Sequence, residues 1–228
     1  MAPVAHSWLS PGQSEYAEIE ARLPRYEYDP QRATQMIEAL GYTRSGDGVG
    51  RDPTGQRLEV EIRSDGPDAN ANAAAGVADY WQRIGVRAST LHATGRLGQD
   101  PELVATFPGF RLTSSPHDAS MSILRSAQVA LPENGFQVSG PPNHSRYMSP
   151  ELDGLIDTHE RTIRPQERVP LMGRIVQHVA DQLPVIGIYY NANAHAHAHR
   201  LLNVGTAQTG QGPRARNAAW NAHEWDVP

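Results

Sequence analysis

Two helix patterns alternate with two strand patterns in the first half of the chain, and this order constrains the fold more than any other feature. Apolar residues at helical spacing predict helices over residues 29–40 and 71–84. Alternating apolar and polar residues predict a strand at 58–63, and a short strand follows at 86–91. Such an order is typical of an α/β layer, so we expect a mixed sheet flanked by helices rather than a helical bundle or a β-sandwich.

The helix predicted at residues 29–40 carries its own start and stop signals. Asp29 is a good N-cap, because its carboxylate can accept hydrogen bonds from the first amides, and Pro30 suits the first helical position. Gly41 supplies the left-handed residue that commonly ends a helix. The apolar face consists of Ala33, Met36, Ile37 and Leu40.

The rest of the chain continues the alternation less regularly. Residues 1–28 are expected to form an extended lead-in packed on the domain, and residues 29–228 a single α/β domain. The further predicted strands lie around 104–112, 185–190 and 201–204. The further predicted helices lie at 121–126, from Pro150 onward with Ser149 as cap, and at 165–183. Residues 131–143 form the longest irregular segment, and loops of that length are often functional.

The composition argues against several partners and chemistries. Lys and Arg number 20 against 25 Asp and Glu, and the resulting net charge of −5 does not favour nucleic acid or an anionic membrane. The chain has no cysteine, which excludes disulfides, thiol chemistry and Cys-based zinc sites. No apolar run is long enough for a membrane span, and the first residues lack the pattern of a signal peptide.

No common catalytic motif is present. The sequence lacks a Gly-x-Ser-x-Gly elbow, a His-Glu-x-x-His pair, a P-loop and a Gly-x-Gly-x-x-Gly turn. Asp153 and Asp157 form an i, i+4 pair that is most simply a solvated acidic face. We therefore predict that the protein is not an enzyme and uses no cofactor.

Three histidines near the C-terminus are candidates for metal ligands. His195, His197 and His199 alternate with alanines, which would place their imidazoles on one face of a strand, about 7 Å apart. Neighbours of this kind can chelate a transition metal. Because no supporting carboxylate is evident, a solvated strand edge is the favoured interpretation and no metal site is predicted.

Six phrases occur in a characteristic order along the chain. They include Tyr-Asp-Pro-x-x-Ala at 28–33 and Asn-x-Ser-x-Tyr-x-x-Pro-Glu-Leu-Asp at 143–153. The full set comprises residues 28–42, 48–63, 78–86, 143–153, 184–190 and 220–225. The ordered set resembles the family 5 extracytoplasmic solute-binding proteins, which are the receptors of peptide and nickel ABC importers.

The resemblance implies a particular place in a larger protein. Family members are much longer and hold their ligand between two lobes, and all six phrases match the second half. The chain thus resembles the C-terminal lobe of a type II periplasmic-binding-protein fold, with the N-terminal lobe and the export signal missing. The implied function is the substrate-binding component of an ABC importer, which captures a small solute, peptide-like solutes included, in an interlobe cleft.

The implied partners are the solute, the missing N-terminal lobe and the ABC permease. The implied location of the full-length protein is the periplasm or the extracellular side of the membrane. An alternative is a shortened binding or interaction module of the same fold that takes no part in transport.

The resemblance also implies a ligand-contacting loop after residue 109. The expected contacts are Phe110, Arg111, Thr113, His117 and Asp118, and the alternative is an ordinary strand end. In peptide-binding members a Gly-Trp-x-x-Asp phrase sets the aspartate against the α-ammonium group of the peptide. Here a neutral Thr113 stands at that point and Asp118 is out of register, so a peptide amino terminus is poorly served.

A second polar cluster follows the long irregular segment. Asn143, Arg146 and Tyr147, together with Ser145, are further candidates for ligand contact. In the alternative interpretation, Asn143 and Tyr147 hold their loop over the helix that follows it.

Overall fold

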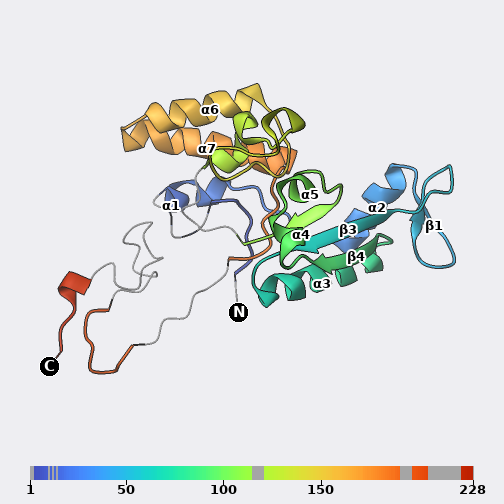
Figure 1. Ribbon diagram of the computed structural model, residues 1–228, viewed down its shortest axis with the longest axis horizontal. Coiled ribbons are helices and arrows are strands. Elements are labelled where there is room, and N and C mark those ends of the chain that lie inside the picture. Colours follow the sequence, from blue (N-terminus) through green and yellow to red (C-terminus); the bar gives the residue numbers. More distant parts are fainter. Residues whose placement is uncertain are drawn as a thin grey trace. The chain divides into compact units, whose positions relative to one another are not determined.

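The computed structural model describes most of the 228-residue chain, which divides into two compact units (Figure 1). The described residues are 3–9, 11, 13, 15–114, 121–190, 197–204 and 222–227. The sheet unit comprises Glu27–Ser115 and Ala130–Gln137, and the helical unit comprises Met1–Tyr26, Pro116–Val129 and Val138–Pro228. The division into a lead-in at 1–28 and one domain at 29–228 stays a prediction.

The sheet unit is built on three parallel strands. Strand β3 (Glu59–Ser64) lies between β4 (Arg87–His92) and β5 (Phe110–Leu112). An α/β layer with a sheet flanked by helices is confirmed. The described strands of this sheet are all parallel rather than mixed, because antiparallel pairing is confined to a separate hairpin of β1 (Thr43–Arg44) and β2 (Gly50–Arg51).

Helices lie on both faces of this sheet (Figure 1). Helix α3 (Asp68–Arg83) follows β3 and covers the face on which Ile62 is buried. The buried core there comprises Ile62, Ala74, Ala78 and Ala88. On the opposite face the guanidinium of Arg63 lies 3.9 Å from the centroid of the Phe107 ring, and its Nη1 donates to the Leu103 carbonyl at 3.3 Å.

The strand predicted around residues 104–112 is only partly correct. Two short helices, α4 (Arg96–Gln99) and α5 (Pro101–Ala105), precede β5, which begins only at Phe110. The carboxylate of Asp100 caps α5 by accepting from the amides of Glu102 and Leu103 at 3.1 and 3.2 Å. A capping aspartate followed by proline starts a helix, and this local signal outweighs the apolar pattern of the next residues.

Helix α2 (Pro30–Ala39) begins as its sequence predicts, yet it buries no residue. The Asp29 carboxylate accepts from the Arg32 amide at 2.8 Å, which confirms the cap. On the apolar face, however, Leu40 is 76% exposed and Met36 is 61% exposed. Helical spacing therefore identified the helix correctly without identifying a buried face.

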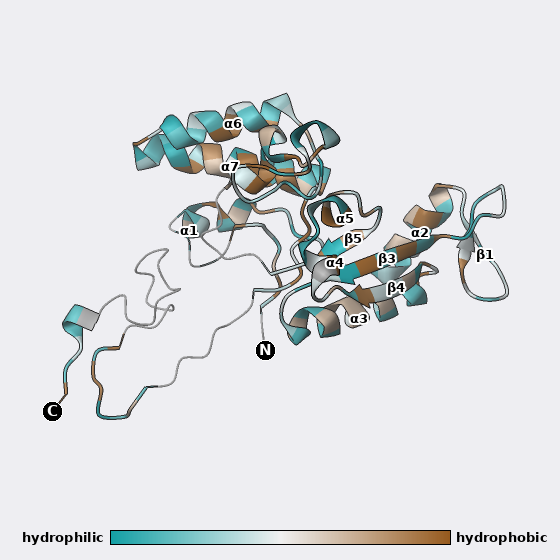
Figure 2. Ribbon diagram, viewed as in Figure 1, coloured by the Kyte–Doolittle hydropathy of each residue, from teal (hydrophilic) through white to brown (hydrophobic). Residues whose placement is uncertain are grey.

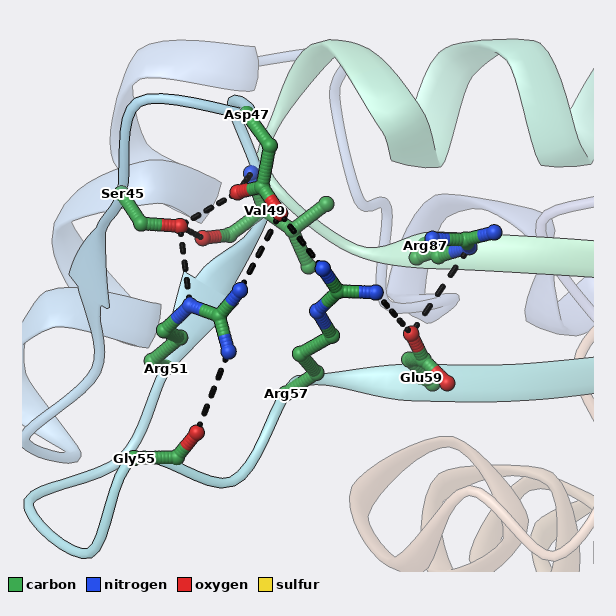
Figure 3. Close-up of polar contacts among 8 residues, drawn as sticks. All are labelled: Ser45, Asp47, Val49, Arg51, Gly55, Arg57, Glu59 and Arg87. Carbon is green, nitrogen blue, oxygen red and sulfur yellow. Dashed lines mark hydrogen bonds and ion pairs between the residues drawn. The ribbon is translucent and has the colours of Figure 1, made fainter.

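A chain of ion pairs joins the β1–β2 hairpin to the sheet (Figure 3). Asp47 Oδ2 lies 3.1 Å from Arg51 Nη2 and 3.0 Å from Arg57 Nη2. Arg57 Nη1 lies 3.5 Å from Glu59 Oε1, which is 3.7 Å from Arg87 Nε. The exposed charges of this hairpin are thus largely matched to one another.

Asp47, which pairs with two arginines of that chain, is an unusually strong acid. A hydrogen bond from the Ser45 hydroxyl, another from the Val49 amide and the two neighbouring guanidinium groups lower the pKa of Asp47 to about 2. These contacts favour the charged form of the carboxylate, so the network persists well below neutral pH.

The helical unit is dominated by two helices, α6 (Pro150–Arg161) and α7 (Pro165–Gln182). The shorter helical segments are α1 (Tyr16–Ile19), η1 (Glu20–Arg22), η2 (Met121–Leu124), η3 (Ser126–Gln128) and η6 (Ala222–Glu224). The Ser149 hydroxyl accepts from the Leu152 amide at 3.2 Å and Pro150 follows it, as the sequence predicts. Figure 2 shows hydrophobic residues interspersed with hydrophilic ones along α6 and α7, as expected for helices that bury one face.

The core of the helical unit consists of two apolar clusters. One joins α6 to α7 and comprises Leu124, Leu152, Leu155, Ile156, Ile175 and Val179. The other packs residues from the start of the chain on α7 and comprises Leu9, Ile19, Leu23, Val169, Met172 and Val176. Helical spacing in both long helices therefore does correspond to a buried face.

The buried strand predicted at residues 185–190 is wrong. This segment pairs only briefly with residues 3–5, through a bridge between Tyr189 and Val4, and both Ile186 and Ile188 are exposed. Residues 201–204 likewise contribute only the isolated bridge of Leu202 with Asp226. In both segments no long described neighbour strand supplies a ladder of hydrogen bonds, so apolar composition alone does not create a strand.

Within the described ranges, no helix combines the length and the hydropathy that a membrane crossing requires.

Candidate functional site

Polar side chains gather where the three parallel strands of the sheet unit end. Because the strands are parallel, the carboxyl ends of β4, β3 and β5 meet at one edge, at His92, Ser64 and Leu112. In open α/β sheets ligands bind outside this edge. We call the side chains there the carboxyl edge: Ser64, Asp65, Asn70, His92, Arg111, Thr113 and Ser114.

The centre of the carboxyl edge is the Asp65 carboxylate. Arg111 Nε donates to Asp65 Oδ2 at 2.6 Å, and the Thr113 hydroxyl donates to Asp65 Oδ1 at 2.8 Å. The pleat of β5 places Arg111 and Thr113 on the same face, and the register that aligns Arg63 with Arg111 brings Asp65 beside both. Two predicted site residues are thus brought together by a third residue that the sequence did not single out.

The first turn of α3 is tied to the same place. The buried Asn70 side chain donates through Nδ2 to the Asp65 carbonyl at 2.6 Å and accepts through Oδ1 from the Ser114 hydroxyl at 2.9 Å. Gly66 makes the tight turn between strand and helix with a φ of +78°, a conformation that glycine adopts without strain. The loop geometry around Asp65 is therefore fixed from both sides.

On the other face of the sheet, Ser64 and His92 form a second pair. The buried Ser64 hydroxyl lies 2.9 Å from His92 Nδ1. Neither residue was predicted, nor were Asp65, Asn70 and Ser114. A signal was available, because Ser64, Asp65 and His92 directly follow the two strands predicted at 58–63 and 86–91, where parallel strands present their ligand-binding ends.

Phe110 does not join this cluster. It is 45% exposed and packs edge-on against Trp81 of α3, with ring centroids 4.9 Å apart. Since Arg111 points to the opposite face, the two predicted contacts lie on different sides of the strand. The predicted contacts His117 and Asp118 lie outside the described residues.

The second predicted cluster lies in the helical unit and has a clear structural role. Asn143 is 1% exposed, and its Nδ2 donates to the carbonyls of Arg125 and Tyr147 at 3.1 and 3.0 Å. Its Oδ1 accepts from the Ser145 hydroxyl at 2.7 Å. These bonds hold the loop ahead of α6, which is the alternative that the sequence left open for Asn143.

Two neighbours of Asn143 are placed differently. The Tyr147 hydroxyl lies 2.8 Å from Nε2 of His178 in α7, whereas Arg146 is exposed and adopts a φ of +57°. Contact of Asn143, Arg146 and Tyr147 with a ligand stays a prediction.

The histidines near the C-terminus form no described metal centre. His197 and His199 are exposed, and His195 lies outside the described residues. Over the described ranges, no group of three His, Cys, Asp or Glu side chains is arranged to hold a metal ion.

A shallow cavity of about 500 Å³ lies elsewhere in the sheet unit, between α2 and the C-terminal end of α3. Its lining residues include Gln31, Thr34, Glu38, Arg44 and Arg83. It is separate from the carboxyl edge, because it lies beside the last turn of α3 whereas the carboxyl edge contacts the first turn.

Comparison with known proteins identifies the fold. No family model matches the sequence, and no curated protein matches it. An oligopeptide-binding protein from Thermus thermophilus, solved with a pentapeptide, matches with a TM-score of 0.73 and 21% identity, over 94% of this chain and 38% of that one.

Two further solved structures match in the same way. A periplasmic oligopeptide-binding protein of an ABC transporter from Thermotoga maritima, solved with mannohexaose, has a TM-score of 0.67 and 19% identity, over 91% of this chain and 40% of its own. NikZ from Campylobacter jejuni, solved with Ni(L-His), has a TM-score of 0.61 and 20% identity, over 89% of this chain and 40% of its own.

The chain therefore has an α/β fold that corresponds to part of a type II periplasmic binding protein. More particularly, it has the fold of part of the oligopeptide- and nickel-binding group that the ordered sequence phrases resemble. It spans 38–40% of the length of these three structures.

Proposed function

We propose that this chain is the C-terminal lobe of a solute-binding protein that serves an ABC importer, and that the carboxyl edge contacts the solute. The observation that carries this proposal is the polar cluster around Asp65, which lies where open parallel sheets bind ligands. The shared fold of the oligopeptide-binding proteins supports it. In this proposal the lobe acts by binding and performs no catalysis.

The partners follow from the same proposal. A companion lobe faces the carboxyl edge and closes over the solute by a hinge motion. A permease then receives the closed, solute-loaded protein. The protein works outside the cytoplasmic membrane. Arg111 and Thr113 are the predicted contacts that the geometry supports most directly, and Phe110, His117, Asp118, Asn143, Arg146 and Tyr147 stay candidates.

The alternative is a shortened binding module of the same fold that takes no part in transport. The shared fold supports it as well as it supports transport, because a fold alone does not specify a function. Transport requires a companion lobe and a permease, whereas the alternative requires neither. Co-purification of this chain with a permease therefore supports transport, and a stable complex with another class of protein supports the alternative.

The fold does not set the solute. The three matched structures hold a pentapeptide, mannohexaose and Ni(L-His), so side chains rather than backbone must decide what each protein binds. A test should accordingly use several classes of probe.

The test is an NMR titration of the ¹⁵N-labelled chain with trialanine, acetate, maltotriose and the Ni²⁺–histidine complex. We expect saturable shifts of the backbone amides of residues 64–70 and 111–114, at about millimolar dissociation constants, because one lobe offers half a cleft. The absence of edge shifts with every probe contradicts the proposal. A rise of several degrees in Tm with one probe contradicts a different part of the proposal, namely that this chain offers only half of the binding cleft. Such a rise requires tight binding, as expected of a complete site.

A further inference from the structure

We propose that the carboxyl edge recognises an anionic oxygen group of the solute, a carboxylate in the first instance, through the terminal nitrogens of Arg111. This inference rests on the proposed function and names the chemical class of its ligand. It also gives Asp65 a defined role, which is to hold the guanidinium in place and to limit its positive charge.

The first support is the hydrogen-bonding state of Arg111. Its Nε donates to Asp65 Oδ2 at 2.6 Å, and among the described residues this is its only hydrogen bond. Within the described ranges the terminal Nη1 and Nη2 groups have no partner, and they form a planar fork that matches the two oxygens of a carboxylate. The orientation of that fork is fixed in advance, which reduces the entropy lost on binding.

The second support is partial burial. The side chains of Arg111 and Asp65 are 24% and 20% exposed, so a ligand can reach the guanidinium while bulk water screens it only in part. A fully exposed arginine would bind an anion more weakly, because salt screens it more completely.

The third support concerns the opposite charge. Both oxygens of Asp65 already accept hydrogen bonds, one from Arg111 and one from Thr113. A ligand ammonium would have to share this carboxylate with a guanidinium of the same sign, which disfavours it. Thr113 stands where peptide-binding family members carry an aspartate that pairs with an ammonium group. Asp65 lies beside the Thr113 hydroxyl but does not take over that role.

The neighbouring arginine differs from Arg111 in a way that sharpens the assignment. Arg63 is aligned with Arg111 across β3 and β5, but its guanidinium lies over the Phe107 ring and 3.6 Å from Glu61. Its Nη1 also donates to the Leu103 carbonyl. Both terminal nitrogens of Arg63 thus face groups of the protein, and its Nε is buried without a hydrogen bond within the described ranges. The terminal nitrogens of Arg111 have no partner among the described residues.

The experiment follows the Arg111 Nε–Hε resonance and the edge amides of the ¹⁵N-labelled chain at constant ionic strength. The probes are acetate, succinate and methylammonium. We expect saturable shifts with the two carboxylates and none with methylammonium. Saturable shifts with methylammonium, or carboxylate shifts that grow linearly like those of added chloride, overturn the inference.

Variants assign the effect to Arg111. Arg111→Gln should abolish the saturable acetate response, and Arg111→Lys should weaken it about tenfold, because an ammonium keeps the charge but loses the fork. The matched control is Arg87→Gln, which removes the same charge from the amino-terminal end of β4, beside Glu59, and should respond like wild type. An unchanged acetate response in folded Arg111→Lys and Arg111→Gln overturns the inference.

Asp65→Asn separates this role from a purely structural one. Removing the like charge should tighten acetate binding about threefold or more, since the guanidinium is no longer neutralised. The Arg111 Nε–Hε resonance should at the same time lose the low-field shift of a charge-assisted hydrogen bond. If Asp65→Asn changes stability while the acetate midpoint stays constant, the pair only fastens β5 to β3 and the inference fails.

Failure of the inference is distinguishable from failure of the proposed function. If maltotriose, which carries no charge, shifts the edge amides while no carboxylate-bearing probe does, the anion preference is wrong and the binding lobe stands. If no probe of any charge shifts those amides, both are wrong.

Discussion

Two polar clusters that look alike in the sequence behave differently in the structure. Asn143 in the helical unit spends both N–H groups and its side-chain oxygen on the loop around it. Arg111 in the sheet unit spends only its Nε, and among the described residues its terminal nitrogens have no partner. A polar group that the protein saturates serves the fold, whereas one held in place but left with free donors can serve a ligand.

The largest loss of stability is expected from a substitution of Asn143, whose side chain makes all of its hydrogen bonds within the protein. Asn143→Leu removes the buried donor of the Arg125 and Tyr147 carbonyls, so the unfolding free energy should fall by about 2–4 kcal/mol. Chemical denaturation measures the loss. Asn72→Ala, the control on the exposed side of α3, should be neutral or slightly stabilising, because alanine is the better helix former. A changed acetate response in Asn143→Leu contradicts a purely structural Asn143.

The side chain of His159 is intermediate between Asn143 and Arg111 in how many of its hydrogen-bonding groups have partners. It is fully buried in α6, and its Nε2 accepts from Arg168 Nε at 3.1 Å, but its buried Nδ1 has no hydrogen-bond partner in the part of the chain that the structure describes. Burial lowers the pKa of the imidazole below its ordinary 6.5, and the Arg168 guanidinium lowers it further. Two carboxylates, Glu15 and Glu160, act in the opposite direction.

The second prediction follows from the sign of that shift. Because the folded protein holds His159 neutral, its contribution to stability is fully present above pH 6.5 and is lost as the pH falls through the lowered folded pKa. Denaturation midpoints should therefore drop more between pH 7.5 and pH 5 in wild type than in His159→Gln. His199→Gln, which removes an exposed imidazole, should follow wild type. Parallel pH dependences of wild type and His159→Gln would count against the prediction.

A smaller effect is expected at Ser145, which supplies a single bond to the saturated cluster. Ser145→Ala leaves the buried Asn143 Oδ1 without its donor, so the unfolding free energy should fall by about 1 kcal/mol. Thermal unfolding monitored by circular dichroism is sufficient to detect it. A loss as large as that of Asn143→Leu would mean that Ser145 also orients residues beyond Asn143.

Much of the fold could be predicted from local patterns, because those patterns report what the backbone needs. The cap at Asp29, the cap at Ser149 and the strands at 58–63 and 86–91 all appear within one or two residues of where they were expected. The buried strand at 185–190 failed, because strand formation depends on a neighbour that composition does not reveal. Burial of α2 could not be read from periodicity either, since an apolar face is buried only where something covers it.

The candidate site was predictable only in part for a related reason. Arg111 and Thr113 were found through a family phrase, but their partner Asp65 follows a different strand, β3. Register between strands far apart in sequence is a tertiary property, so no local pattern could show that a carboxylate lies beside both. What the sequence did contain was the position of Asp65, directly after a strand whose carboxyl end lies at the ligand-binding edge.

The smallest effect on stability, and the sharpest contrast with Ser145, is expected at Thr113. Thr113→Val deletes one hydroxyl hydrogen bond, as Ser145→Ala does, but the Asp65 oxygen that loses its donor remains accessible to water. The unfolding free energy should therefore change by no more than about 0.5 kcal/mol. Acetate binding, by contrast, should weaken about twofold, because Asp65 without the Thr113 bond holds the Arg111 fork less firmly. If Thr113→Val instead costs as much stability as Ser145→Ala and leaves the acetate midpoint unmoved, the two clusters do not differ in kind, and the carboxyl edge is part of the scaffold.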